Sequence, residues 1–125
     1  MFNFSGKRPD DLGVNDGKLK SCPGTPNCVS SQSNNLTEKV EPLPAVPISE
    51  IKKVVESMER TTIITETDNY LYAEFKSKLM GFVDDVEFYL DKDANVVHVR
   101  SASRLGKSDL GVNRARVEEI RSKLK

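Results

Sequence analysis

Residues 61–101 alternate between apolar and polar side chains with a period of two, and β-branched and aromatic residues dominate this stretch. The alternation predicts four strands, at residues 61–67, 70–77, 82–90 and 96–101. Short connections that contain Asp, Asn or Gly separate the strands, and connections of this length join antiparallel neighbours. We therefore expect a four-stranded antiparallel meander with one face buried against the rest of the chain.

Two helices are predicted to pack against this sheet. Apolar side chains follow helical spacing over residues 48–58, directly after an extended segment that contains three prolines. The second helix is predicted to begin at Asn113, its N-cap, because Val112 and Val117 have the spacing of a hydrophobic staple. With both helices on one face of the sheet, the expected fold class is α+β, in a single domain that spans residues 1–125.

Residues 1–47 show little periodicity and are rich in Gly, Pro, Asn, Asp and Ser, which predicts an extended arm that wraps over the core. Val29 and Val40 are each expected to begin a short edge strand. The sequence Asp-Leu-Gly-Val-Asn occurs at residues 11–15 and again at residues 109–113. Five identical residues are too few for a duplicated domain, so each copy is interpreted as a local glycine turn.

Charge and hydropathy argue against several classes of protein. The 19 basic residues balance 19 acidic ones, so no net field draws the molecule onto nucleic acid or an anionic membrane. The N-terminus lacks the apolar run of a secretory signal, and no stretch approaches ~18 consecutive apolar residues. We therefore expect a cytoplasmic protein that neither binds nucleic acid nor inserts into a membrane.

Cys22 and Cys28 enclose the sequence Pro-Gly-Thr-Pro-Asn, which favours a compact chain reversal that brings the two sulfurs close together. Three interpretations stay open: two buried thiols that pin the arm, a disulfide or redox pair, and a metal site. The first is favoured because a reducing compartment keeps thiols free. Metal is the weakest because zinc requires four ligands, and the chain has one His and no further Cys. We expect no metal and no other cofactor.

Asp84 is predicted to share the inward face of its strand with apolar residues, which makes it a candidate buried carboxylate. The expected register sets it across from Ser103 and close to Arg104. A structural Asp84–Arg104 ion pair is the favoured interpretation, because buried carboxylates are usually paired. The alternative is a general acid or base, or a polar anchor for a ligand, with Asp85 as its neighbour.

On the outer face of the predicted sheet, His98 is expected to be exposed beside Tyr89, and Glu87 is expected opposite Arg100. An exposed sheet histidine is the favoured interpretation. The alternative makes His98 the base for a cysteine nucleophile, which requires the arm to cross this face. No feature of the sequence argues for such a crossing.

Basic residues cluster around the start of the second predicted helix. Arg114 and Arg116 lie in its first turn and oppose the positive end of the helix dipole, a cost that folding alone does not explain. A bound phosphate or carboxylate would explain it, and internal pairing with Asp84, Asp85 and Asp109 is the alternative. The predicted ligand-binding residues are Arg100, Ser101, Ser103, Arg104, Lys107, Asn113, Arg114 and Arg116.

Three motifs, taken in order, resemble one known family. They are Cys-Pro-Gly-Thr-Pro-Asn-Cys-Val-Ser-Ser at residues 22–31, Gly-Phe-Val-Asp-Asp-Val-Glu-Phe at residues 81–88, and Arg-Ser-Ala-Ser-Arg-Leu-Gly-Lys-Ser-Asp-Leu-Gly-Val-Asn-Arg at residues 100–114. From Leu12 onward the chain resembles the domain of unknown function 1499 family. The resemblance implies a bacterial or plastid-type protein, with relatives in cyanobacteria and plants, and it implies no activity or catalytic residues. Many relatives look secreted or lipid-anchored, and this chain departs from them by lacking a signal.

These features together predict a small binding module for an anionic or amphipathic small ligand, held at the arginine-rich loop and the start of the last helix. Binding requires only an anion-ready helix start, whereas an enzyme requires a nucleophile, a base and an orienting group that the sequence does not bring together. One alternative is a thiol-redox or hydrolytic enzyme that uses Cys22, Cys28 or Asp84. The other is a structural or assembly factor that docks on a protein partner.

Overall fold

The computed structural model describes residues 6–78, 81–106 and 109–124. Every helix and strand predicted from periodicity is present, with ends that differ by one or two residues, and the α+β class is confirmed. The elements in chain order are β1 (Cys28–Ser30), β2 (Leu43–Pro44), α1 (Ile48–Ser57), β3 (Thr61–Glu66), β4 (Tyr70–Lys76), β5 (Val83–Asp91), β6 (Val96–Ser103) and α2 (Val112–Lys123).

Within the described residues the sheet contains six strands, the four of the expected meander and two short ones. Its order is β1-β6-β5-β4-β3, and β2 also pairs with β6, so two short strands extend the meander at its β6 edge. All pairs of these strands are antiparallel. Val29 lies in β1 as expected, whereas Val40 lies outside the strands and the chain forms β2 a few residues later. Strands of two and three residues are too short to show a period, which explains the miss.

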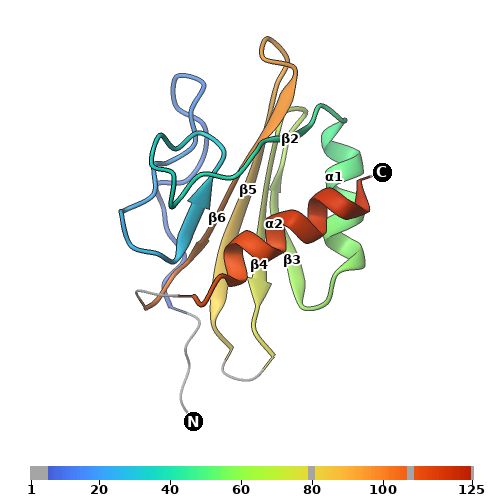
Figure 1. Cartoon of the computed structure of the whole chain (residues 1–125). Coiled ribbons are helices and arrows are strands. Elements are labelled where there is room, and N and C mark those ends of the chain that lie inside the picture. Colours follow the sequence, from blue (N-terminus) through green and yellow to red (C-terminus); the bar gives the residue numbers. More distant parts are fainter. Residues whose placement is uncertain (1–5, 79–80, 107–108, 125) are drawn as a thin grey trace.

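Both helices pack against one face of the sheet (Figure 1). The buried side chains of that face form an apolar cluster with those of the helices. The register aligns Leu71, Phe88 and Val99 in one row across β4, β5 and β6. Ile51 of α1 and Ile120 of α2 join the same cluster, and all five side chains are fully buried. Burial at roughly 25 cal/mol per Å² of apolar surface makes this side the main source of hydrophobic stabilisation.

The opposite face of the sheet carries buried polar side chains, and the N-terminal arm crosses it. Asp85, Glu87 and Arg100 project from β5 and β6 on this side, and all three are buried. Gly13 of the arm donates its backbone N–H to Glu87 Oε1 at 2.9 Å. Its φ of 120° lies where residues with a side chain are strained, so glycine suits this contact. The expectation of an exposed outer face is therefore wrong, because the arm crosses it.

The start of α2 also differs from the prediction, because its N-cap is Gly111, with a φ of 83°, two residues before the predicted Asn113. Asp109, not Asn113, satisfies the first N–H groups of the helix. Its carboxylate accepts hydrogen bonds from the backbone N–H of Gly111 and of Asn113, at 2.8 and 2.9 Å. Asn113 is instead fully buried, and its side chain donates to Ser103 Oγ at 3.0 Å. The predicted N-cap thus serves to dock the helix on the end of β6.

Candidate functional site

Asp84 forms its ion pair with Arg116 of α2, at 2.8 Å, and not with Arg104. The predicted partner is wrong because Ser103, opposite Asp84, and Arg104, the next residue, project on opposite sides of the sheet. The Arg116 guanidinium also lies 4.8 Å from the centre of the Phe75 ring, within cation–π range. These are the contacts of a structural ion pair between sheet and helix.

Arg104 lies on the arm side of the sheet, where Asp85 and Glu74 accept its hydrogen bonds. The Nε donates to Asp85 Oδ2 at 3.0 Å and Nη2 donates to Asp85 Oδ1 at 2.8 Å. Arg8 of the arm donates to the same Glu74 carboxylate at 2.6 Å. The hydrogen bonds to Asp85, reinforced by those to Glu74, raise the pKa of Arg104. Arg104 therefore joins the end of β6 to β5 and β4, and the arm reaches the same cluster through Arg8.

The other predicted ligand-binding residues near α2 also have partners within the protein. Arg114 donates to two backbone carbonyls of the arm, at 2.8 and 2.9 Å. Ser101 donates to Asn113 Oδ1 at 2.6 Å, and Ser103 Oγ accepts from the Asn113 amide. Lys107 lies outside the described residues. The protein's own groups therefore hold the start of α2, as the internal-pairing alternative expects.

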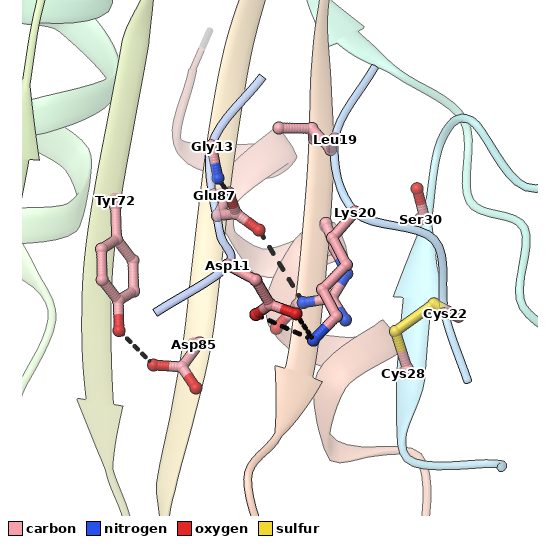
Figure 2. A network of polar contacts seen from close by, with 12 residues as sticks. Asp11, Gly13, Leu19, Lys20, Cys22, Cys28, Ser30, Tyr72, Asp85 and Glu87 are labelled. Carbon is pink, nitrogen blue, oxygen red and sulfur yellow. Dashed lines mark hydrogen bonds and ion pairs between the residues drawn. A yellow bond between two sulfur atoms is a disulfide. The ribbon is translucent and has the colours of Figure 1, made fainter. Parts of the chain in front are cut away.

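Arg100 differs from the arginines above. It projects from β6 towards the arm, is 4% exposed, and its Nε has no hydrogen-bond partner. Glu87 lies opposite it as expected, but the ion pair spans 3.7 Å, and Glu87 Oε2 also lacks a hydrogen bond. Oε1 of Glu87 accepts from the Tyr70 hydroxyl at 2.6 Å and from Gly13, which Figure 2 shows beside it. Burial raises the pKa of Glu87 and lowers that of Arg100.

A cavity of about 260 Å³ lies between the arm, the loop at residues 22–28 and the adjoining parts of β5 and β6. Leu12 and Pro23 contribute apolar surface to its lining. Of the predicted ligand-binding residues, Arg100, Ser103 and Arg104 line this cavity, whereas those on α2 do not. Its polar lining consists of Lys20, Thr25, Asn27, Asp85, Arg100, Ser103 and Arg104.

Cys22 and Cys28 form a disulfide, with their Cα atoms 5.7 Å apart (Figure 2). The favoured interpretation of two free thiols is therefore wrong, and a sulfur bonded to sulfur is not a thiolate ligand for a metal. Cys28 lies in β1 opposite Ala102 of β6, so the disulfide ties the loop to the sheet. The Asn27 amide donates to the Gly106 carbonyl at 2.7 Å. The loop is thus held at several points where it forms one wall of the cavity.

His98 lies opposite Tyr89, with ring centroids 6.1 Å apart, but its side chain is only 15% exposed because the arm covers it. Its Nδ1 lies 3.2 Å from Ser31 Oγ and its Nε2 lies 3.4 Å from Asp91 Oδ2. Sequence reasoning missed this contact because Ser31 is 67 residues away, in the arm. Ser31 Oγ also accepts the Val99 backbone N–H and is buried, so these residues tie the arm to the sheet. Neither polar partner of His98 is a cysteine.

Residues 6–78, 81–106 and 109–124 present neither a cluster of metal ligands nor a helix suited to cross a membrane. No group of three or more His, Cys, Asp or Glu side chains there is placed to hold a metal ion. No helix in these residues combines the length and the apolar character needed to cross a bilayer.

A family model described as "Protein of unknown function (DUF1499)" matches residues 18–124. The match includes all three motifs that carry the resemblance, which is thereby confirmed. Comparisons with curated proteins and with solved structures gave no significant match.

Proposed function

The chain belongs to the DUF1499 family, a membership that assigns no activity, and we propose from its own contacts that it is a binding module for a small anionic ligand. Arg100 holds the ligand in the cavity between the arm and the sheet. The observation that carries the proposal is that Arg100, a buried residue among those that line that cavity, has an Nε without a hydrogen-bond partner. The proposal keeps the anionic ligand predicted from the sequence and moves it from the helix start to the other face of the sheet.

The energetics of a buried cation support this assignment. Removing an ion from water costs several kcal/mol unless an opposite charge and hydrogen bonds compensate for it. Charge-assisted hydrogen bonds have lengths of about 2.7–2.9 Å, so the 3.7 Å ion pair with Glu87 offsets only part of this cost. A ligand carboxylate or phosphate supplies the missing acceptor oxygens, and the planar fork of arginine fits such groups.

The neighbouring residues fit the same ligand. Leu12 and Pro23 give the cavity apolar walls, and Lys20 in its lining is paired with Asp11 at 2.8 Å, while Arg100 keeps an N–H without an acceptor. The candidates for an enzyme have less support. Cys22 and Cys28 are bonded to each other, and the Asp84 carboxylate is engaged by a helix arginine.

The first prediction concerns stabilisation by anions. Acetate, benzoate and inorganic phosphate are titrated against the full chain while its melting temperature is measured. At least one of these anions is expected to raise the melting temperature. At a concentration of 100 times its dissociation constant, the anion adds about 2.7 kcal/mol to the free energy of unfolding. Arg100→Met is expected to abolish this response because it removes the cation and keeps the side-chain volume. Arg114→Met removes the same charge at the start of α2 and is expected to keep the response.

Two results would overturn the proposal: no anion stabilises the wild-type protein, or the two single variants respond alike. Arg100→Met leaves Glu87 buried beside no cation, which lowers stability by itself. The double variant Arg100→Met with Glu87→Gln avoids that charge and gives a second background in which the anion response must also be absent.

A further inference from the structure

The other cations beside the cavity are already paired. In each pair a carboxylate oxygen lies within 3 Å of the cation, so the pair has no uncompensated positive charge to offer a ligand. Arg100 and Glu87 form a further, fourth pair whose charged atoms are 3.7 Å apart. In this pair Arg100 Nε and Glu87 Oε2 each lack a hydrogen bond. The three close pairs are Arg8–Glu74, Lys20–Asp11 and Arg104–Asp85.

This charge balance limits what the cavity accepts. While Glu87 is ionised, the fourth pair is neutral as a whole, and an added anion places a second negative charge beside a buried carboxylate. Like charges in a buried site repel strongly, because little solvent screens them. Protonation of Glu87 removes the repulsion and leaves Arg100 with a single positive charge, which matches a single negative charge on the ligand.

We infer that the cavity binds a singly charged carboxylate together with one proton, which Glu87 takes up from solvent. This inference rests on the proposed function and names its ligand class. Glu87 Oε2 is the oxygen that faces Arg100 and has no hydrogen bond, so the proton is placed there. Oε1 keeps its hydrogen bonds from Tyr70 and Gly13.

The groups around Glu87 support proton uptake at this residue. Burial raises the pKa of Glu87, and the negative charge of Asp85 on the same strand acts in the same direction. The Tyr70 hydroxyl from β4, the Gly13 N–H from the arm and the Arg100 charge from β6 oppose the rise. Burial outweighs them, so the carboxyl is held above its ordinary range.

The shape and lining of the cavity favour a small carboxylate with an apolar body. Leu12, Pro9 and Pro23 supply apolar surface, while Arg100 matches the planar carboxylate. A volume of about 260 Å³ lies below the usual range for drug-sized ligands. A dianion brings a second charge that the three close ion pairs do not compensate.

The test measures benzoate binding to the full chain by titration calorimetry, from about pH 6 to about pH 8, in buffers of different ionisation enthalpy. Benzoate is expected to bind with uptake of up to one proton, and its affinity is expected to fall by up to about tenfold per pH unit. Phthalate, a dianion of similar shape, and neutral benzamide are expected to bind at least about tenfold more weakly.

Glu87→Gln mimics the protonated carboxyl and is expected to bind benzoate without proton uptake and without the pH dependence. Glu119→Gln is the control, because it removes an exposed carboxylate on α2, outside the cavity lining, and is expected to leave proton uptake unchanged. If benzoate binds without taking up a proton, if phthalate binds as tightly, or if Glu87→Gln still takes up the proton, the inference fails while anion binding stands. If none of these anions binds at any pH, the proposed function fails.

Discussion

Both polar atoms of the buried Asn113 side chain form hydrogen bonds. Its amide donates to the Asn27 carbonyl and to the Asp109 carboxylate, and its carbonyl oxygen accepts from Ser101 and Arg116. A residue so fully engaged positions other elements, because one side chain fixes the loop, the end of β6 and the start of α2 together. The buried guanidinium proposed to bind the anion is the opposite case, and that contrast separates a structural polar group from a binding one.

At this scale, Asn113→Ala is expected to lower the free energy of unfolding by about 2–4 kcal/mol, because each partner left buried and unsatisfied costs about 1–3 kcal/mol. Denaturant unfolding measures the change. Asn34→Ala, at an exposed position of the arm, is the control and is expected to change stability by no more than about 0.5 kcal/mol. Equal losses in the two variants would contradict the anchoring role.

Among the elements, β3 to β6 and both helices could be predicted because each is long enough for its period to appear in the sequence. The edge strand at Val29 was expected, but the place of β2 and the pairing of β1 and β2 with β6 were not, because each has at most three residues and pairs with a strand more than 50 positions away. The partner of Asp84 depends on which face α2 covers, which pairing within the sheet alone does not decide.

The candidate site was predictable only in part. Arg100, Ser103 and Arg104 were named from the sequence because they belong to the cluster of basic and hydroxyl residues before the last helix, although the ligand was expected at the helix start. Lys20 and Asn27 were missed, because the arm crosses the sheet without any periodic signal. The Cys-Pro-Gly-Thr-Pro-Asn-Cys loop marked the family, but its place as a wall of the cavity required the structure.

The disulfide between Cys22 and Cys28 is expected to stabilise both the fold and the cavity. Reduction of the Cys22–Cys28 disulfide is expected to lower the free energy of unfolding by about 2 kcal/mol, because it frees a short loop in the unfolded chain. It is also expected to weaken anion binding, because the loop forms a wall of the cavity. Unfolding and benzoate titrations with and without dithiothreitol measure both effects.

The variant with Cys22→Ser and Cys28→Ser controls for the reductant, since dithiothreitol is expected to change neither its stability nor its binding. Unchanged affinity in the reduced wild-type protein would show that the cavity wall does not depend on the disulfide. That result would leave the role of Arg100 untouched.

Ion pairs join the N-terminal arm to the sheet. Glu74 on β4 accepts hydrogen bonds from Arg8 in the arm and from Arg104 at the end of β6. The hydrogen bond from Arg8, with a further one from Arg104, lowers the pKa of Glu74 although burial opposes the shift. Loss of the Glu74 charge is therefore expected to loosen the arm.

The pH dependence of this contact has a definite sign. A carboxyl with a lowered pKa in the folded state stabilises the fold above its unfolded pKa, and this stability is lost as the pH falls. The melting temperature is therefore expected to drop as the pH falls below the ordinary value of 4.5, and Glu74→Gln is expected to reduce that drop. Glu119→Gln, at an exposed position of α2, is the control. An unchanged drop in Glu74→Gln would contradict the assignment.

The polar layer beneath the arm also constrains how sequences of this fold can diverge. On the helix side of the sheet, a substitution is tolerated when it keeps the volume of the side chain. Beneath the arm, a substitution is tolerated when it keeps the net charge of the buried side chains. A buried carboxylate that loses its basic partner destabilises the fold. Related chains are therefore expected to drift one position at a time on the helix side, and in compensating acid and base pairs under the arm.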